Sequence, residues 1–207
     1  MKVILINGSP HEKGCTYTAL AEVARSLGEN GVESEIIWVA RGDMTGCNVC
    51  HYCHRTENGC IKKDIVNEVA AKLTEADGLV VGSPVYYSSA SGQIISFMDR
   101  LFCSSANNLC RKPAAAVVSC RRSGSTATFD QLNKYFSINN MPIVSSNYWN
   151  AVHGNTPAEV MCDLEGLQTM RQLGQNMAWL LRCISAGCEA GIVPPVYEKR
   201  LSTNFIR

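Results

Sequence analysis

The chain has 207 residues, of which 46% are hydrophobic and 18% are charged, and its formal net charge is +1 at pH 7. This length fits one domain, which we place at residues 1–207, and the near-zero charge without a run of like charge argues against nucleic acid or an anionic membrane surface as partner. No apolar run has the length of a transmembrane helix and no signal peptide precedes the first predicted strand, so we expect a cytoplasmic protein.

The first predicted unit is a strand, a loop and a helix. Val3–Ile6 is an unbroken apolar run, typical of a strand buried on both faces of a parallel sheet. Asn7–Pro10 ends this strand, and apolar residues recur at helical spacing after Gly14. The first turn of such a helix carries unpaired backbone N–H groups and the positive end of the helix dipole, which favours a bound phosphate.

The loop between this strand and helix is neither a Walker A loop nor a G-x-G-x-x-G loop. Its hydroxyl groups, without a Lys-Ser or Lys-Thr pair, favour a permanently bound monophosphate over a triphosphate with magnesium. An ordinary turn with a capping threonine is the alternative.

Further strands and helices alternate along the chain. Strands are predicted at residues 33–40, 78–82, 113–119 and 142–145, and helices at residues 65–74, 91–102, 126–138 and 157–186, the last with a break. The alternation predicts an α/β protein with a three-layer flavodoxin-like fold, whose five-stranded parallel sheet has the strand order 2-1-3-4-5. In this order, the polar turns after strands 1, 3 and 4 converge on one ligand site.

The second and third of these turns have the chemistry that a flat aromatic cofactor needs. The turn after the third strand combines small hydroxyl residues with Tyr86 and Tyr87, which supply an aromatic surface. The turn after the fourth strand adds Arg121 and Arg122, whose charge would stabilise a reduced, anionic ring. The alternatives are core packing for the tyrosines and a solvated turn for the arginines.

Three blocks of the chain read, in order, NGSPHEKGCTYTAL, GSPVYYSSASGQIISFMDR and SCRRSGSTATFDQL. They resemble the NADPH-dependent FMN reductases of the flavodoxin-like superfamily. The resemblance implies an enzyme that binds FMN, takes electrons from NAD(P)H and reduces a flavin, a quinone or another small molecule. It also implies that the flavin, rather than a catalytic side chain, carries the chemistry.

The resemblance also implies which residues hold FMN. Residues of the first block would hold the phosphate: Ser9, Cys15, Thr16, Tyr17 and Thr18. Residues of the second would line the isoalloxazine: Pro84, Val85, Tyr86, Tyr87 and Ser88. Residues of the third would close over its edge: Arg121, Arg122, Ser123, Gly124 and Ser125.

A cysteine-rich insertion is predicted at residues 41–64. Its four cysteines, spaced C-x2-C-x2-C-x6-C, are Cys47, Cys50, Cys53 and Cys60. Such spacing in a reducing compartment indicates a metal site and is typical of iron–sulfur ligation. It resembles the motif of iron–sulfur flavoproteins, which implies a [4Fe-4S] cluster that exchanges electrons with FMN. Zinc and empty, redox-active thiols remain as alternatives.

Two histidines, His51 and His54, lie among these thiols as possible substitute ligands, although solvated loop histidines are the simpler interpretation. The remaining cysteines show no ligand spacing, and we interpret them mostly as small core residues: Cys103, Cys110, Cys120, Cys162, Cys183 and Cys188.

The segment after the fifth predicted strand is rich in aromatic residues. Tyr148, Trp149 and His153 could form part of a nicotinamide or acceptor pocket, or they could simply pack on the sheet edge. The last segment, residues 190–207, is predicted to be a tail that lies across a partner subunit, and the resemblance implies a homodimer or homotetramer.

Two other functions are compatible with parts of this pattern. A low-molecular-weight tyrosine phosphatase needs a Cys-x5-Arg signature, and none of the eleven cysteines has an arginine six positions on. A non-enzymatic electron carrier, of the flavodoxin or iron–sulfur flavoprotein type and working with a redox protein as partner, remains open. Flavodoxins are usually strongly acidic, whereas this chain is near neutral.

Overall fold

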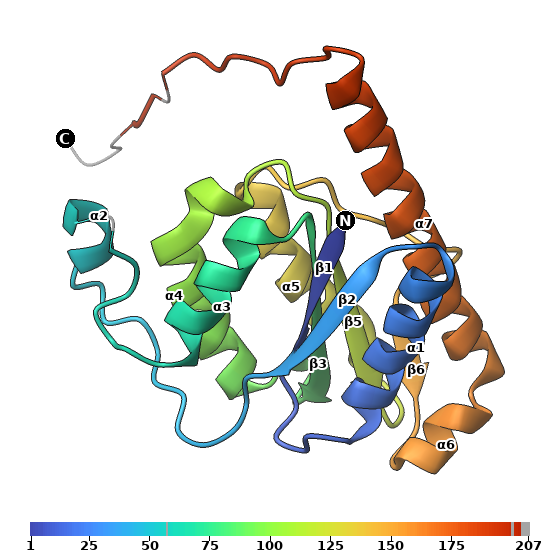
Figure 1. The fold of residues 1–207 in the computed structure, drawn as a ribbon. Coiled ribbons are helices and arrows are strands. Elements are labelled where there is room, and N and C mark those ends of the chain that lie inside the picture. Colours follow the sequence, from blue (N-terminus) through green and yellow to red (C-terminus); the bar gives the residue numbers. More distant parts are fainter. Residues whose placement is uncertain (57, 200, 204–207) are drawn as a thin grey trace.

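A parallel β-sheet forms the centre of this computed structural model, which describes residues 1–56, 58–199 and 201–203 (Figure 1). The strands are β1 (Lys2–Asn7), β2 (Glu33–Trp38), β3 (Gly78–Tyr86), β4 (Ser89–Ala90), β5 (Ala114–Cys120) and β6 (Ala151–His153). The helices are α1 (Cys15–Glu29), α2 (Tyr52–Thr56), α3 (Ile65–Glu75), α4 (Gly92–Leu109), α5 (Ser125–Ile138), α6 (Pro157–Cys162) and α7 (Leu164–Glu189). Glu57 of the predicted insertion, and Arg200 and residues 204–207 of the predicted tail, lie outside the described residues.

The strand order of the sheet is β2-β1-β3-β5-β6, and each neighbouring pair in this series is parallel. These five strands therefore have the predicted order 2-1-3-4-5. The short strand β4, which pairs antiparallel with the end of β3, accounts for the difference in numbering. The three-layer flavodoxin-like fold is confirmed.

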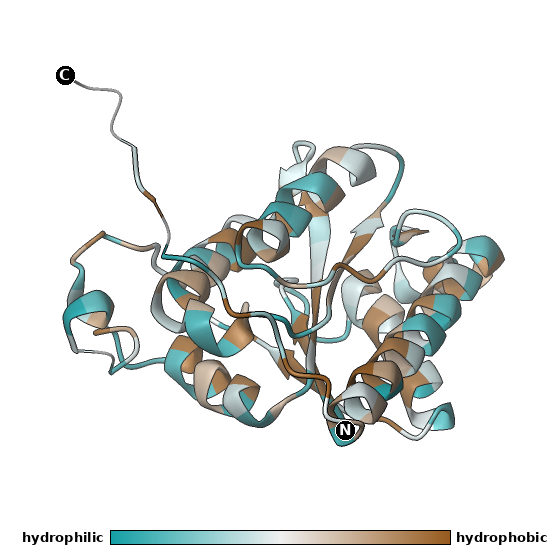
Figure 2. Cartoon of the chain, turned by 90° about the horizontal axis from the view of Figure 1, so that it is seen from above, coloured by the Kyte–Doolittle hydropathy of each residue, from teal (hydrophilic) through white to brown (hydrophobic). Residues whose placement is uncertain are grey.

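Alternating side chains along β1 divide the core into two halves. Ile4 and Ile6 pack with residues of α3, α4 and α5, whereas Val3 and Leu5 pack with residues of α1, α6 and α7. All four side chains are fully buried, and burying each such side chain stabilises the fold by about 1.5–3 kcal/mol. Figure 2 shows hydrophobic segments along the central strands and, on the helices, hydrophobic and hydrophilic residues in alternation.

The predicted strand at residues 142–145 is wrong, because the edge strand of the sheet is β6. The 142–145 segment makes one isolated bridge, between Ile143 and Ala114 at the start of β5. The chain then loops outward and pairs again at the end of β5, where Ala151 lies opposite Val118. The apolar pair Ile143-Val144 marks only the first of these two contacts, so the local pattern misplaced the strand.

Several element ends also differ from the predictions. The strand predicted at residues 78–82 continues to Tyr86, where β4 folds back on it. The helix predicted at residues 91–102 continues to Leu109, and α2 lies unpredicted inside the cysteine-rich insertion. The predicted break in the last helix is confirmed at Asp163, between α6 and α7.

The interpretation of six cysteines as mostly core residues is wrong. Cys120 is buried and Cys110 is half-buried, whereas four are exposed: Cys103, Cys162, Cys183 and Cys188. All four exposed cysteines lie on helices, at positions that face solvent rather than the core. Across the part of the chain that the structure describes, no helix combines the length and apolar character needed to cross a membrane.

Candidate functional site

Three turns meet at the carboxyl ends of β1, β3 and β5. Gly8 N donates a hydrogen bond to Gly82 O at 2.9 Å, which joins the end of β1 to β3. The hydroxyls of Thr16 and Ser119 lie 2.8 Å apart and join α1 to the end of β5. The structure thus brings together the three turns that the strand order predicts to converge.

The N-terminus of α1 carries the first of these turns. Its N-cap residue, Gly14, supplies no side-chain hydrogen bond, and the first turn contains no acidic residue. By contrast, α3, α4, α6 and α7 are each capped by a side chain, from Asp64, Ser91, Thr156 and Asp163. Among the described residues, the first backbone N–H groups of α1 therefore lack a side-chain acceptor, and they can bind an anion.

The side chains predicted to hold the phosphate differ in whether their own hydrogen-bond donors are already used within the protein. Thr16 is buried and shares its hydroxyl with Ser119, and Thr18 donates its hydroxyl to Gly14 O at 3.2 Å. Ser9 accepts a hydrogen bond from His11 N at 3.1 Å, which leaves its own proton for a ligand. Cys15 donates to Gly154 O at 3.7 Å, and burial raises the pKa of its thiol.

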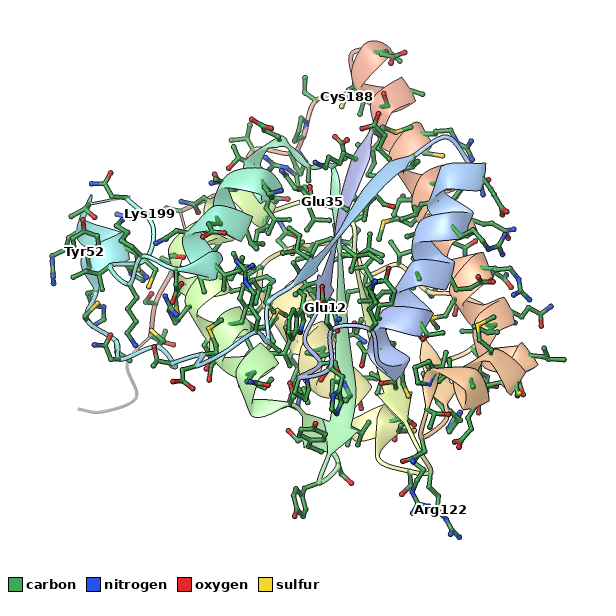
Figure 3. The ribbon with its side chains drawn as sticks, turned by 60° about the horizontal axis from the view of Figure 1, so that its bottom comes forward. Glu12, Glu35, Tyr52, Arg122, Cys188 and Lys199 are labelled. Carbon is green, nitrogen blue, oxygen red and sulfur yellow. The ribbon has the colours of Figure 1, made fainter. Side chains whose placement is uncertain are left out.

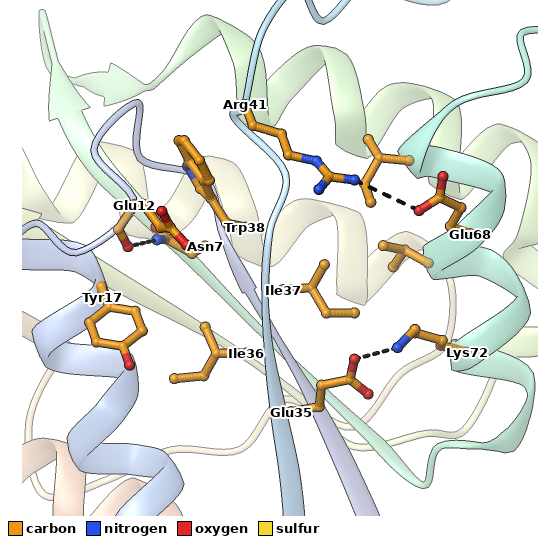
Figure 4. A pocket seen from close by; sticks show the side chains of 12 residues that line it. Asn7, Glu12, Tyr17, Glu35, Ile36, Ile37, Trp38, Arg41, Glu68 and Lys72 are labelled. Atoms are coloured by element: carbon orange, nitrogen blue, oxygen red, sulfur yellow. Dashed lines mark hydrogen bonds and ion pairs between the residues drawn. The ribbon is translucent and has the colours of Figure 1, made fainter.

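Tyr17 lies away from this cradle. Its side chain lines a groove of about 310 Å³ along the edge strand β2, together with Ile36 (Figure 4). Ion pairs between Lys72 and Glu35 and between Arg41 and Glu68 cross the groove. Charged side chains at an edge strand deter pairing with another chain, so we assign no ligand to this groove.

The turn between β3 and β4 consists of Tyr87 and Ser88, whose φ angles are 50° and 59°. Two left-handed central residues make a tight hairpin turn that normally uses Asn and Gly. Tyr87 is completely exposed and Tyr86 is 45% exposed. The alternative that these tyrosines are core residues is therefore wrong, and their rings are available to a ligand.

The turn between β5 and α5 packs against this hairpin. Gly124 has φ +85°, and a Cβ added there would lie 2.8 Å from Ser88 Oγ and 3.0 Å from Val85 Cγ1. Arg121 and Arg122 are exposed, and the side chain of Arg122 extends away from the body in Figure 3. The two turns form one continuous surface with positive charge at its rim.

A pocket of about 250 Å³ adjoins the third turn, because Ser125 is one of its lining residues. Tyr148, Trp149 and His153 also line it, so the structure brings together the three residues predicted for a nicotinamide or acceptor pocket. Tyr148 and Trp149 are 61% and 52% exposed. His153 N donates to Asp163 Oδ2 at 2.6 Å.

The cysteine loop forms a separate site. Its four cysteines, Cys47, Cys50, Cys53 and Cys60, line one pocket, to which α4 contributes Arg100 and Cys103. His51 lines the same pocket, and His54 lines a neighbouring one with Cys53. In Figure 3, Tyr52 of α2 in this loop is well separated from Arg122 in the turn after β5.

The donor set of this pocket includes four cysteine thiols, the ligand type that iron–sulfur clusters use. Within residues 1–56, 58–199 and 201–203, no three His, Cys, Asp or Glu side chains lie close enough to hold one metal ion. A cluster instead takes thiolates that are spread around it. The pocket that these side chains line has a volume of about 30 Å³.

Sequence reasoning missed Arg100 and Cys103. Both lie on α4, whose apolar spacing was used only to predict the helix. Arg100 follows Phe97 by three residues and so shares its buried face, and this charge at a core position was the available signal.

A sequence model of the family described as NADPH-dependent FMN reductase matches residues 1–156. An iron–sulfur flavoprotein of Methanocaldococcus jannaschii is 34% identical over 192 residues, which cover 89% of this chain and 99% of the relative. An iron–sulfur flavoprotein of Methanosarcina thermophila is 28% identical over 192 residues, which cover 89% of this chain and 97% of the relative.

Solved structures share the fold. RosB with a bound riboflavin-phosphate intermediate matches with a TM-score of 0.72 at 13% identity, over 100% of this chain and 93% of that one. An NAD(P)H:quinone oxidoreductase from Methanothermobacter marburgensis matches with a TM-score of 0.67 at 17% identity, over 86% of this chain and 96% of that one.

Proposed function

Because this chain belongs to the NADPH-dependent FMN reductase family and is a flavin-dependent oxidoreductase, we propose that its three converging turns hold FMN and that NAD(P)H is its electron donor. One observation carries this proposal. The uncapped N-terminus of α1, the exposed hairpin at Tyr86 and Tyr87 and the positively charged turn after β5 meet at the carboxyl ends of the strands. The helix N-terminus suits the phosphate of FMN, the hairpin suits its aromatic ring, and the charged turn suits the edge of the ring when it is anionic.

The residues of the site bind and orient rather than react. The first N–H groups of α1 and the hydroxyl of Ser9 hold the phosphate, and the hairpin at Tyr86 and Tyr87 covers the ring. Arg121 and Arg122 supply positive charge at the ring edge. A bound FMN would supply the redox chemistry, hydride uptake from a nicotinamide and electron transfer to an acceptor, which these side chains cannot supply themselves. The pocket at Tyr148, Trp149 and His153 receives the nicotinamide or the acceptor.

The cysteine loop adds a second proposed cofactor. Cys47, Cys50, Cys53 and Cys60 would hold a [4Fe-4S] cluster, in keeping with the iron–sulfur flavoprotein names of the relatives and with the shared pocket of the four thiols. Held by these thiols, a cluster would supply single-electron chemistry. We also propose a cytoplasmic location, because a reducing compartment keeps such thiols available for ligation.

We further propose a homodimer or homotetramer. The cysteine loop and the three turns lie apart within one chain (Figure 3), so assembly with a second copy is the way to bring a cluster near an FMN. The final acceptor would be a flavin, a quinone, another small molecule or a redox protein.

The first test uses protein purified without oxygen. We expect flavin absorbance bands and about four irons and four sulfides per chain, the composition of one cubane. Steady oxidation of NADPH or NADH should follow when free flavin or quinone is added. If anaerobic reconstitution gave no FMN complex, the central proposal would be wrong.

Other results separate the remaining alternatives. Protein that contains flavin with zinc, or flavin with free thiols and no iron, would support the proposed reductase and contradict the proposed cluster. A flavin complex that oxidises neither nicotinamide would favour a non-enzymatic electron carrier. Cys60→Ser should lose iron, whereas the control Cys183→Ser, at an exposed position on α7, should keep it.

A further inference from the structure

Arg100 is a buried charge with no role in the proposed flavin site. It is 1% exposed and lies on α4 among fully buried apolar residues, including Phe97 and Leu101. Moving an unpaired guanidinium from water to such a position is strongly unfavourable. A buried arginine is stable at this position only if hydrogen-bond acceptors surround its guanidinium.

All the acceptors of the Arg100 side chain lie in the cysteine loop or at its end. Asp64 accepts two hydrogen bonds, at 2.6 Å from Nη1 and 2.9 Å from Nη2. Nη2 also donates to Lys62 O at 3.1 Å, and Nη1 to Thr45 O at 3.4 Å and towards Met44 Sδ at 3.6 Å. One side chain thus holds both limbs of the loop, before the first motif cysteine and after the last.

The remaining donor, Nε, points at Cys60 Sγ at 3.4 Å. Cys60 is also fixed through its backbone, because Asn67 of α3 bonds its N–H at 2.9 Å and its carbonyl at 3.0 Å. Asp64 in turn caps α3 by accepting from Val66 N at 3.1 Å. Cys60 is therefore held from two helices, whereas Cys47 and Cys50 are exposed.

We propose that Arg100 is a positioning residue that fixes Cys60 as a cluster ligand and raises the cluster's reduction potential through the Nε–H···Sγ hydrogen bond. This inference rests on the proposed cluster. A hydrogen bond to a ligand sulfur stabilises the reduced, more negative state. Asp64 offsets part of the positive charge, but the directional N–H···S contact comes from Arg100 alone among the contacts described.

The test compares midpoint potentials of four anaerobically reconstituted proteins by spectroscopic redox titration, with iron and sulfide analysis of each. Arg100→Lys keeps the charge and loses the Nε donor. The double variant R100M/D64N removes both charges, so that no carboxylate is left unpaired. Lys62→Met is the matched control, because Lys62 lines the same pocket but donates to Thr45 Oγ1 and Gly46 O rather than to sulfur.

At the wild-type midpoint potential, we expect the ratio of reduced to oxidised cluster to fall about three- to tenfold in both Arg100 variants. The Lys62→Met protein should shift less. Loss of iron from Arg100→Lys but not from Lys62→Met would also support the positioning role.

Arg100 variants with a full cluster at the wild-type potential would overturn the inference and leave the proposed cluster standing. Wild-type protein that takes up no iron and sulfide would instead overturn the proposed cluster itself.

Discussion

Single residues at the candidate flavin site hold backbone conformations that ordinary side chains avoid. Tyr87 and Ser88 are left-handed, and so is Gly124 in the turn packed against them. A left-handed conformation costs a residue other than glycine about 1–2 kcal/mol. It persists where the surroundings impose it, and such strain is concentrated at functional sites.

Gly124→Ala tests the contact between the two turns. The added Cβ would meet Ser88 Oγ at 2.8 Å as well as carrying the left-handed penalty. We expect the free energy of unfolding to fall by about 2–3 kcal/mol and FMN binding to weaken. Denaturant unfolding and flavin titration measure the two effects.

Gly42→Ala is the matched control, because Gly42 has φ +90° with no atom of the described chain within 4 Å of the added Cβ. It should lose only about 1 kcal/mol. Equal losses in the two variants would mean that the contact with Ser88 is unimportant.

At the scale of elements, the N-terminus of α1 lacks a stabilising side-chain cap among the described residues, and its free N–H groups are therefore available to an anion. A side-chain cap there would contribute about 1 kcal/mol, yet Gly14 supplies none. Helices away from the three turns, such as α3 with Asp64, do have such caps.

Gly14→Asp should therefore stabilise the FMN-free protein and weaken FMN binding at least about tenfold, because a carboxylate would face the phosphate. Gly14→Asn, a neutral cap of similar size, is the control for crowding against His11 Cβ, 3.0 Å from an added Cβ. Flavin titration of both variants decides the matter. If Asn and Asp weakened binding equally, charge at this terminus would not be the cause.

The packing of α1 on α7 includes an ion pair with a defined pH dependence. Glu22 binds Arg25 on its own helix and Arg171 of α7, at 2.7 Å from Nη1. The hydrogen bond from Arg25, opposed by burial and helped by Arg171, lowers the pKa of Glu22. A lowered folded pKa contributes stability above the unfolded pKa of about 4, and that stability is lost as the pH falls through the folded pKa.

Glu22→Gln should thus lower the free energy of unfolding by about 1 kcal/mol at pH 7, and by progressively less below about pH 4. Glu29→Gln, which alters a more exposed partner of Arg25, should change it little. Urea unfolding across this pH range measures both. A pH-independent loss in Glu22→Gln would exclude the ion pair as its origin.

At the scale of the whole molecule, the tail that begins at residue 190 carries apolar side chains that no other part of the described chain covers. Val193, Val196 and Leu201 are 80%, 99% and 86% exposed, and the segment runs clear of the body in Figure 1. Its hydrogen bond to the body, from Asn140 Nδ2 to Tyr197 Oη, is itself exposed. Apolar side chains displayed in this way fit the prediction of a tail that covers a partner subunit.

Ending the chain after Ile192 should leave the unfolding transition of each subunit unchanged and lower the mass of the assembly. Light scattering and denaturant unfolding of the full and shortened chains measure these outcomes. An unchanged mass would mean that the tail does not hold the assembly together.

The sequence by itself determined the order of the parallel strands, the three turns at their carboxyl ends and the spacing of the cysteine motif. The strand order follows from the alternation of strands and helices along the chain. The turns follow from local patterns: Val3–Ile6 is an apolar run that fits burial on both faces, and Asn7–Pro10 ends that strand. Burial and turn chemistry act on neighbouring residues, so a short window of sequence contains the information.

Only the tertiary structure decided which distant surfaces meet. It moved the edge strand from residues 142–145 to β6, because pairing depends on where β5 offers free backbone groups. It also placed Arg100 against Asp64 and Cys60, 36 and 40 residues away along the chain. A buried charge is tolerated only beside its partners, and the packing of α4 against the loop supplies those partners.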